Sequence, residues 1–249
     1  MIDKFMQDPL ANSLAVIVLI ALIITWITSL ILTLGDAPVP TSKGWYAWLM
    51  PICTLLGVPA VLGLLQTQGT TAAFAAVVFV VFILNMLIPI LRITGKSSHP
   101  LVKDWYKWAI PITVVGGLVV AGYLTFIEST GTQASCGPLG HCAQVQQSSY
   151  AILFGILPIG VFGLVGYIAV LAAWLVWQFG PVAMKKLGAI VTWGMCIFGV
   201  LFSAYLTFLE PFVIGATCMW CISSAVSMII LLLASTPAAQ QAFAIESDD

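Results

Sequence analysis

Long apolar segments separated by short polar connections dominate this chain. Seven segments stand out, and each is long enough, at roughly 20 residues, to cross a lipid bilayer. They cover residues 12–34, 47–66, 72–94, 108–127, 150–177, 187–209 and 214–235. Lipid offers peptide groups no hydrogen-bond partner, so each span has to satisfy its own backbone. The pattern therefore predicts an all-α integral membrane protein with seven transmembrane helices.

Composition supports this fold class and excludes others. The chain of 249 residues is 61% hydrophobic and only 7% charged, whereas a soluble domain is about 25% charged. No basic patch suggests a nucleic-acid partner. The first segment is too long for the core of a signal peptide, and only Lys4 provides a positive charge before it, so we expect a retained span.

The eight basic residues predict the orientation, because cytoplasmic connections carry an excess of Lys and Arg. Seven of them fall in the first, third and fifth connections, which lie on one side of a seven-span protein. These are Lys43, Arg92, Lys96, Lys103, Lys107, Lys185 and Lys186. We therefore expect a multi-pass protein of the inner (plasma) membrane, with the N-terminus outside and the C-terminal AIESDD in the cytoplasm.

Two short sequences recur along the chain. WYAWLMPI at 45–52 matches WYKWAIPI at 105–112, and GYLTFIE at 122–128 matches AYLTFLE at 204–210. The topology places the two copies of each pair on the same side of the membrane. An old duplication of a helix pair would explain this, and so would selection of similar residues at similar depth.

Four of the six cysteines fall on the outer side in this topology. Cys136 and Cys142 lie in the loop SCGPLGHC, and Cys218 and Cys221 form a Cys-x-x-Cys at the start of the seventh span. Disulfides persist on that side. Cys53 and Cys196 fall within spans, where we expect ordinary buried side chains.

A Cys-x-x-Cys at a helix start has a physical use. The free N–H groups of the helix N-terminus stabilise a thiolate, which is the form that attacks disulfides and electrophiles. Trp220 lies between the two cysteines and would supply an aromatic wall. His141, next to Cys142, would favour a thiolate there or be an ordinary loop residue.

Three interpretations compete for these four cysteines. They could form two structural disulfides, bind zinc together with His141, or form two redox pairs that exchange with each other. Zinc is disfavoured because thiols outside the cytoplasm oxidise. Spacing alone leaves structural and redox pairs open.

The residues around the cysteines resemble the vitamin K epoxide reductase family, especially its bacterial members. CAQVQQSSYAILFGILPIGVFGLVGY from Cys142 to Tyr167 matches the family's loop cysteine, serine and Gly-rich helix. AYLTFLEPFVIGATCMWCISSAVSM matches its last helix pair, and GYLTFIES the end of its first helix. The likeness covers about residues 105–235.

The resemblance implies a four-helix bundle around a quinone, formed by the last four spans. It implies that Cys221 reacts with the quinone and that Cys218 resolves Cys221 and exchanges with Cys142. Cys136 would pair with Cys142 and meet the thiols of a partner. Ser148, or Ser149 beside it, would hydrogen-bond the quinone, and Trp220 would also contact it. The alternative role of these serines is to cap a helix before YAILFG, and both roles could hold at once.

The expected activity is a quinone-dependent thiol–disulfide oxidoreductase that makes disulfides in extracytoplasmic proteins, with menaquinone or ubiquinone as acceptor. Vertebrate members have Thr-Tyr-Ala after the motif, whereas this chain has Ser224-Ala225-Val226, which argues against epoxide reduction. The alternative is a non-catalytic subunit of a larger complex with structural disulfides.

The expected organisation has three parts. Residues 1–100 form three helices of unknown role, in which we find no paired polar groups within the spans; they would scaffold the bundle or dock a larger membrane complex. Residues 101–240 form the catalytic domain, and 241–249 a short cytoplasmic tail. Bacterial members often carry a fused thioredoxin-like domain, so its absence here implies a separate soluble thioredoxin-like partner.

Overall fold

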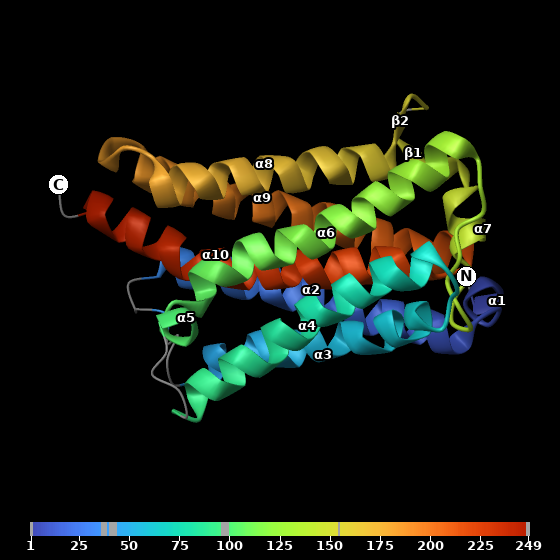
Figure 1. Cartoon of the computed structure of the whole chain (residues 1–249), viewed down its shortest axis with the longest axis horizontal. Helices are drawn as coiled ribbons and strands as arrows, with labels where there is room; N and C mark the ends of the chain where they lie inside the picture. Colours follow the sequence, from blue (N-terminus) through green and yellow to red (C-terminus); the bar gives the residue numbers. More distant parts are fainter. Residues whose placement is uncertain (1, 36–38, 40–43, 96–99, 154, 248–249) are drawn as a thin grey trace.

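A computed structural model describes residues 2–35, 39, 44–95, 100–153 and 155–247. Lys43 and Lys96, which contributed to the predicted orientation, lie outside this part of the chain, as do the last two residues of the predicted tail. Within the described residues, the prediction of seven long apolar helices is confirmed. They run alongside one another (Figure 1). The long helices are α2 (Pro9–Leu34), α3 (Trp45–Leu65), α4 (Thr70–Ile93), α6 (Trp105–Thr130), α8 (Ile159–Phe179), α9 (Val182–Leu209) and α10 (Met219–Ser247).

Short elements join the long helices. Most of them lie at the end of the bundle where the chain begins (Figure 1). They are α1 (Ile2–Phe5), α5 (Pro100–Lys103), α7 (Cys142–Gln146), a 3₁₀ turn at Ser149–Ala151, β1 (Ile152–Leu153), β2 (Leu157–Pro158) and a π-helical turn at Glu210–Ile214. The two strands pair antiparallel, with Leu153 opposite Leu157.

The fifth predicted helix begins later than expected. Residues 150–158 form the 3₁₀ turn and the small hairpin, and α8 starts only at Ile159. Gly155 has φ of 74°, a left-handed conformation that ends regular structure. Pro158 then takes the N-cap position of α8, because a proline inside the helix would remove a hydrogen bond. At the other end of the chain α10 is longer than expected and continues to Ser247.

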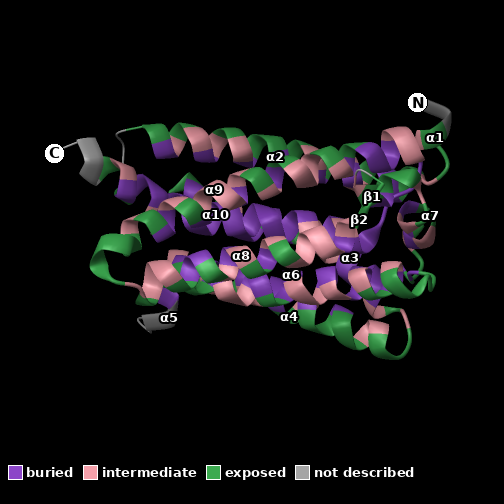
Figure 2. Cartoon of the chain, turned by 90° about the horizontal axis from the view of Figure 1, so that it is seen from above, coloured by how far each residue is buried: buried purple, intermediate pink, exposed green. Residues whose placement is uncertain are grey.

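Helix α10 lies at the centre of the bundle. It packs against α9, α6, α2 and α3, and 89% of its most apolar 18-residue window is buried, against 22% for α8. Figure 2 shows this contrast between α10 and the helices around it, which have exposed outer faces. The exposed apolar side chains of those helices suit a lipid environment.

The three N-terminal helices bond to the rest through buried polar side chains, contrary to the expectation of none. Ser29 on α2 hydrogen-bonds Thr236 on α10 at 2.7 Å. Asn85 on α4 donates to Thr113 on α6 at 3.0 Å. Both bonds cross from residues 1–100 to the C-terminal helices, so the N-terminal part is built into the bundle.

Candidate functional site

Three of the four predicted outer cysteines meet at the end of the bundle. Cys136 and Cys142 are joined in a disulfide, and Cys218 is a free, fully buried thiol just before α10. The sulfur atoms of all three lie within 4.8 Å of one another. This is a suitable arrangement for thiol–disulfide exchange, in which a thiolate attacks a neighbouring disulfide sulfur.

The same three sulfur atoms could be considered as metal ligands. Zinc binds cysteine as the thiolate. With Cys136 and Cys142 bonded to each other, Cys218 is the single thiol of the trio. In this disulfide form the trio offers one thiol ligand to a metal, and its arrangement suits thiol–disulfide exchange instead. Cys53 and Cys196 are buried free thiols elsewhere in the bundle, as predicted.

The first turn of α10 favours a thiolate at Cys218. Burial alone would raise the pKa of the Cys218 thiol, but hydrogen bonds from the Cys221 thiol and from the backbone N–H groups of Cys221 and Trp220 outweigh it and lower the pKa below its ordinary value. This direction is the one expected for a cysteine at a helix N-terminus. A thiolate at Cys218 would be suited to exchange with the loop disulfide, whose sulfur atoms lie within 4.8 Å.

The loop cysteines are covered. The exposed fractions of Cys136 and Cys142 are 6% and 1%, and the backbone N–H of Met219 donates to the Cys136 sulfur at 3.4 Å. Their neighbours Gly137, Pro138 and His141 are exposed. Cys136 can therefore meet a partner's thiol only after the loop lifts from the start of α10.

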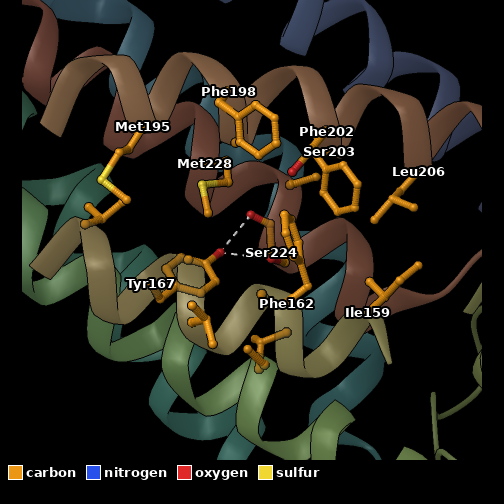
Figure 3. Close-up of a pocket in the computed structure, with 18 of the residues that line it drawn as sticks. Ile159, Phe162, Tyr167, Met195, Phe198, Phe202, Ser203, Leu206, Ser224 and Met228 are labelled. Atoms are coloured by element: carbon orange, nitrogen blue, oxygen red, sulfur yellow. Dashed lines mark hydrogen bonds between the residues drawn. The ribbon is translucent and has the colours of Figure 1, made fainter. Parts of the chain in front are cut away.

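Cys221 contacts Cys218 of this trio and also borders a large apolar cavity. The cavity has a volume of about 500 Å³, within the range of small-molecule sites. It is bounded by α6, α8, α9 and α10, and Cys221 is one of its lining residues. Figure 3 shows much of its wall. Prominent lining side chains are Ile159, Phe162, Met195, Phe198, Phe202 and Met228.

One hydroxyl pair stands out in that wall. The Tyr167 hydroxyl, from α8, lies 2.9 Å from the hydroxyl of Ser224, one helical turn after Cys221 (Figure 3). Tyr167 itself is fully buried. It packs closely on Gly117 of α6, where an added Cβ would lie 2.1 Å from the ring. Gly117 therefore allows Tyr167 to lie in this wall.

A second, smaller cavity adjoins Cys221 on its polar side. Its volume is about 30 Å³, and Gln146, Ser148 and Glu210 line it together with Cys221. Gln146 donates to the Cys221 sulfur at 3.8 Å. Its side-chain oxygen is buried and has no hydrogen-bond partner among the residues that the structure describes. A buried unpaired oxygen is costly, so a polar ligand group at this point would be stabilising.

The three residues predicted to bind a quinone differ in their placement. Ser148 lines the small cavity, and its hydroxyl donates to the carbonyl of Val145 at 2.7 Å. Ser149 is exposed. Trp220 is buried, donates to the carbonyl of Ser135 at 3.0 Å and contacts the Tyr123 ring in a tilted arrangement, so it packs under the loop. Ser148 directly precedes the 3₁₀ turn Ser149–Ala151 rather than a long helix, and its side chain makes no cap hydrogen bond with the described residues.

Glu210 is a site residue that the sequence analysis did not identify. Its exposed fraction is 2%, and its carboxylate accepts a hydrogen bond from the backbone N–H of Cys218 at 3.1 Å and interacts with the Cys221 thiol. Glu128, its counterpart in the repeated YLTF sequence, accepts from the N–H of Gly160 at 2.9 Å. Each copy of the repeat thus ends in a carboxylate that caps the next long helix, and this recurrence was the available signal.

Comparisons with known proteins agree with this geometry. Neither the curated proteins nor the solved structures contain a match to this chain. The profile of the vitamin K epoxide reductase family matches residues 108–236, from α6 to α10. The matched region holds the loop disulfide, the Cys-x-x-Cys and the cavity. The chain therefore belongs to the vitamin K epoxide reductase family, whose members link disulfides to quinones in membranes.

Proposed function

We propose that this protein oxidises thiols of extracytoplasmic proteins to disulfides and passes the electrons to a membrane quinone. The observation that carries the proposal is the position of Cys221. It lines the 500 Å³ apolar cavity, and it belongs to the same motif as Cys218, whose sulfur lies within 4.8 Å of both sulfurs of the loop disulfide. Electrons entering at the loop can thus reach a lipid-like space in one exchange.

The residues present fit a quinone. The apolar cavity suits a hydrophobic ring. Beside Cys221, the Ser148 hydroxyl can turn from Val145 and donate to a quinone carbonyl, and the unpaired oxygen of Gln146 can accept from the hydroxyl of the quinol that forms. We assign ring contacts to Cys221 and hydrogen bonding to Ser148, with Gln146 as an additional partner. A bound menaquinone or ubiquinone would supply one chemistry, the acceptance of two electrons and two protons.

Thiol exchange in the loop comes first. A partner thiolate bonds to Cys136, and Cys142 leaves as a thiolate. The second partner thiol then displaces Cys136, so the partner departs as a disulfide and both loop cysteines are reduced. Such a step requires the loop to lift, since Cys136 is 6% exposed. The soluble partner is inferred to be a thioredoxin-like protein.

Exchange with the membrane pair follows. Cys142 attacks Cys218 of an oxidised Cys218–Cys221 pair, and Cys221 leaves as a thiolate. Cys136 then attacks Cys142, releasing Cys218 and restoring the loop disulfide. The resulting state, a loop disulfide with two free motif thiols, is the one in the structure. Oxidation of these thiols then releases two electrons and two protons.

Glu210 is placed to manage one of these protons. Its buried carboxylate interacts with the Cys221 thiol and lines the small cavity with Gln146 and Ser148. We assign to it the acceptance of the proton that Cys221 loses. Electron transfer from the thiols to the quinone is favourable. The reduction potential of a typical protein dithiol is about −200 mV, and quinones have a much higher potential. For a two-electron transfer, a difference of about 30 mV corresponds to about 1.4 kcal/mol.

The remaining assignments follow the sequence. Residues 101–240 are proposed as the catalytic domain. The protein would lie in a bacterial-type inner membrane, with the redox cysteines on the outer side and the C-terminus in the cytoplasm. The basic residues Arg92, Lys103 and Lys185 lie at helix ends opposite to the disulfide. Residues 1–100 are proposed to support the site, and a further inference concerning them is given below.

The test is an anaerobic assay in detergent. The purified protein is mixed with a reduced thioredoxin-like protein and either ubiquinone or menaquinone analogue, and quinol formation is followed optically while partner disulfides are counted. One quinol per disulfide is expected. Mapping of trapped bonds in Cys136→Ala should also reveal a Cys142–Cys218 disulfide. Unchanging Cys136–Cys142 and Cys218–Cys221 bonds without quinol would instead identify a subunit with structural disulfides.

Filling the cavity should impair use of the quinone. Gly194 lines the cavity, and a Cβ added there would meet no atom within 4 Å, so Gly194→Phe places a ring at the cavity wall. Glycine is among the poorest helix formers, so the helix itself is not weakened. We expect KM for the quinone to rise about tenfold in steady-state assays.

Gly122→Phe is the matched control. Gly122 also lies in a long helix with no atom within 4 Å of an added Cβ, yet it is outside the cavity lining of the described residues. Its KM should stay within twofold of wild type. Equal KM values for the two variants and the wild type would place the quinone elsewhere.

A further inference from the structure

A closed ring of four polar residues joins the N-terminal segment to the redox centre. Asn12 accepts a hydrogen bond from the Thr217 hydroxyl at 2.8 Å. The carbonyl of Thr217 accepts from the backbone N–H of His141 at 2.9 Å. His141 Nδ1 lies 3.4 Å from the Asp8 carboxylate, and the Asn12 N–H closes the ring on the Asp8 carbonyl at 3.0 Å.

The ring holds the backbone next to both exchanging cysteines. His141 directly precedes Cys142, and Thr217 directly precedes Cys218. The loop approaches the turn before α10 so closely that a Cβ on Gly140 would lie 2.4 Å from the Thr217 carbonyl oxygen, and Gly140 has φ of 76°. Opening of this ring between His141 and Thr217 would therefore change the separation between Cys142 and Cys218.

Half of the ring lies outside the region that matches the family. Asp8 and Asn12 precede residue 108, where the match begins. The same segment makes further contacts with the turn after α9. The Lys4 ammonium group donates to the carbonyl of Val213, and a Cβ on Gly215 would come within 3.1 Å of Lys4. The part of this chain that matches the family therefore does not include these supports.

We propose that residues 4–12 are a positioning element of the redox centre, which holds the loop docked on the Cys-x-x-Cys while Cys142 and Cys218 exchange. This inference rests on the proposed function, because the loop has to lift to meet a partner and then return to the same place. The N-terminal helices supply the fixed point to which it returns.

The two contacts of the ring differ in strength. Asn12 and Thr217 are both fully buried, and losing one partner of a buried hydrogen bond leaves the other unsatisfied. The side chains of His141 and Asp8 are 60% and 17% exposed, and exposed ion pairs contribute little. Asn12 is therefore expected to contribute most of the positioning.

The exchange can be measured in the full-length Cys221→Ser protein. There Cys218 attacks Cys142, forming the Cys142–Cys218 bond and breaking Cys136–Cys142; Cys136 leaves as a thiolate and takes up the proton that Cys218 lost. No external oxidant is needed. Exchange is started by a pH jump from 4 to 8, stopped with acid, and followed by mass spectrometry of the linked peptides. Asn12→Ala should lower the exchange rate about tenfold.

Ser29→Ala is the matched control. Ser29 is also on α2 and bonds Thr236 of α10, but it lies 17 residues further along, about 25 Å down the helix. Its loss should lower stability without changing the exchange rate. Asp8→Asn preserves the N-cap of α2, which its side chain provides through the N–H of Ala11. It should slow exchange by about twofold or less, because the contact is exposed.

The outcomes separate the two hypotheses. If the parent Cys221→Ser protein forms no Cys142–Cys218 bond, the proposed function fails. If it does and Asn12→Ala exchanges equally fast, or Ser29→Ala is slowed as much, the positioning role is wrong. Thr217→Val removes the hydrogen bond between Thr217 and Asn12 by deleting its donor, with little change in side-chain shape. It replaces Asn12→Ala in the test if Asn12→Ala does not fold. Adding Asn12→Ala to Thr217→Val should slow exchange little further, because the other side-chain bond of Asn12, to the carbonyl of Phe5, does not reach the redox centre.

Discussion

Replacing Cys221 with serine is expected to lower quinone reduction by at least about a thousand-fold, the size of loss that follows removal of a catalytic nucleophile. Cys221 is the cysteine that lines the apolar cavity. A serine hydroxyl neither forms a disulfide with Cys218 nor donates electrons at neutral pH. The measurement is quinol formation from a prereduced sample by stopped-flow absorbance.

The rest of the thiol chemistry should survive in this variant. The loop disulfide and Cys218 remain within 4.8 Å, so the Cys142–Cys218 bond should accumulate. Cys53→Ser is the matched control, because Cys53 is also a buried free thiol but lies on α3, outside the cavity lining. Full quinone reduction by Cys221→Ser would overturn the proposed function.

Glu210→Gln is expected to slow quinone reduction about 100-fold, a typical contribution of a positioned general acid or base. The amide oxygen of glutamine can still accept the hydrogen bond from Cys218 N–H, so the cap of α10 is preserved. What is lost is the group that takes the proton from Cys221. The rate constant of a single turnover, with and without deuterated solvent, measures the effect.

Glu128→Gln is a close control for that experiment. Glu128 occupies the same position in the repeated sequence and caps α8 through Gly160, but it lies outside both cavities that contain Cys221. It should reduce quinone at the wild-type rate. A rate for Glu210→Gln within twofold of wild type would limit Glu210 to capping.

Much of the architecture was predictable, because a membrane-spanning helix can be recognised in the sequence as a long continuous apolar segment. The gathering of Cys136, Cys142 and Cys218 followed from assigning each to one side of the bilayer. The segment 150–158 was assigned to a helix in error, since its residues are as apolar as those of a span. The left-handed backbone of Gly155 and the N-cap position of Pro158 prevent a helix in this segment, although its residues are apolar.

Other features of the site were hidden from sequence reasoning for a different reason. Asn12 and Thr217 are 205 positions apart, and no local pattern relates one buried polar residue to another at that distance. In the sequence, Gln146 is one of several glutamines in an outer loop. Its side-chain oxygen becomes buried and unpaired only when the chain folds. Glu210 was visible as part of a repeat, but a repeat alone does not identify a proton acceptor.

The central position of α10 sets the route by which a substrate travels in the plane of the bilayer. Helices α2, α3 and α6 cover α10 on several sides, whereas α8 and α9 border the cavity and carry outward side chains such as Val165 and Phe198, which are 60% and 57% exposed although both line it. A lipid-like quinone bound in this cavity would therefore enter and leave on the α8–α9 side. Helices α3 and α4 do not line the cavity, so a neighbouring protein bound on their side would not block exchange of the quinone.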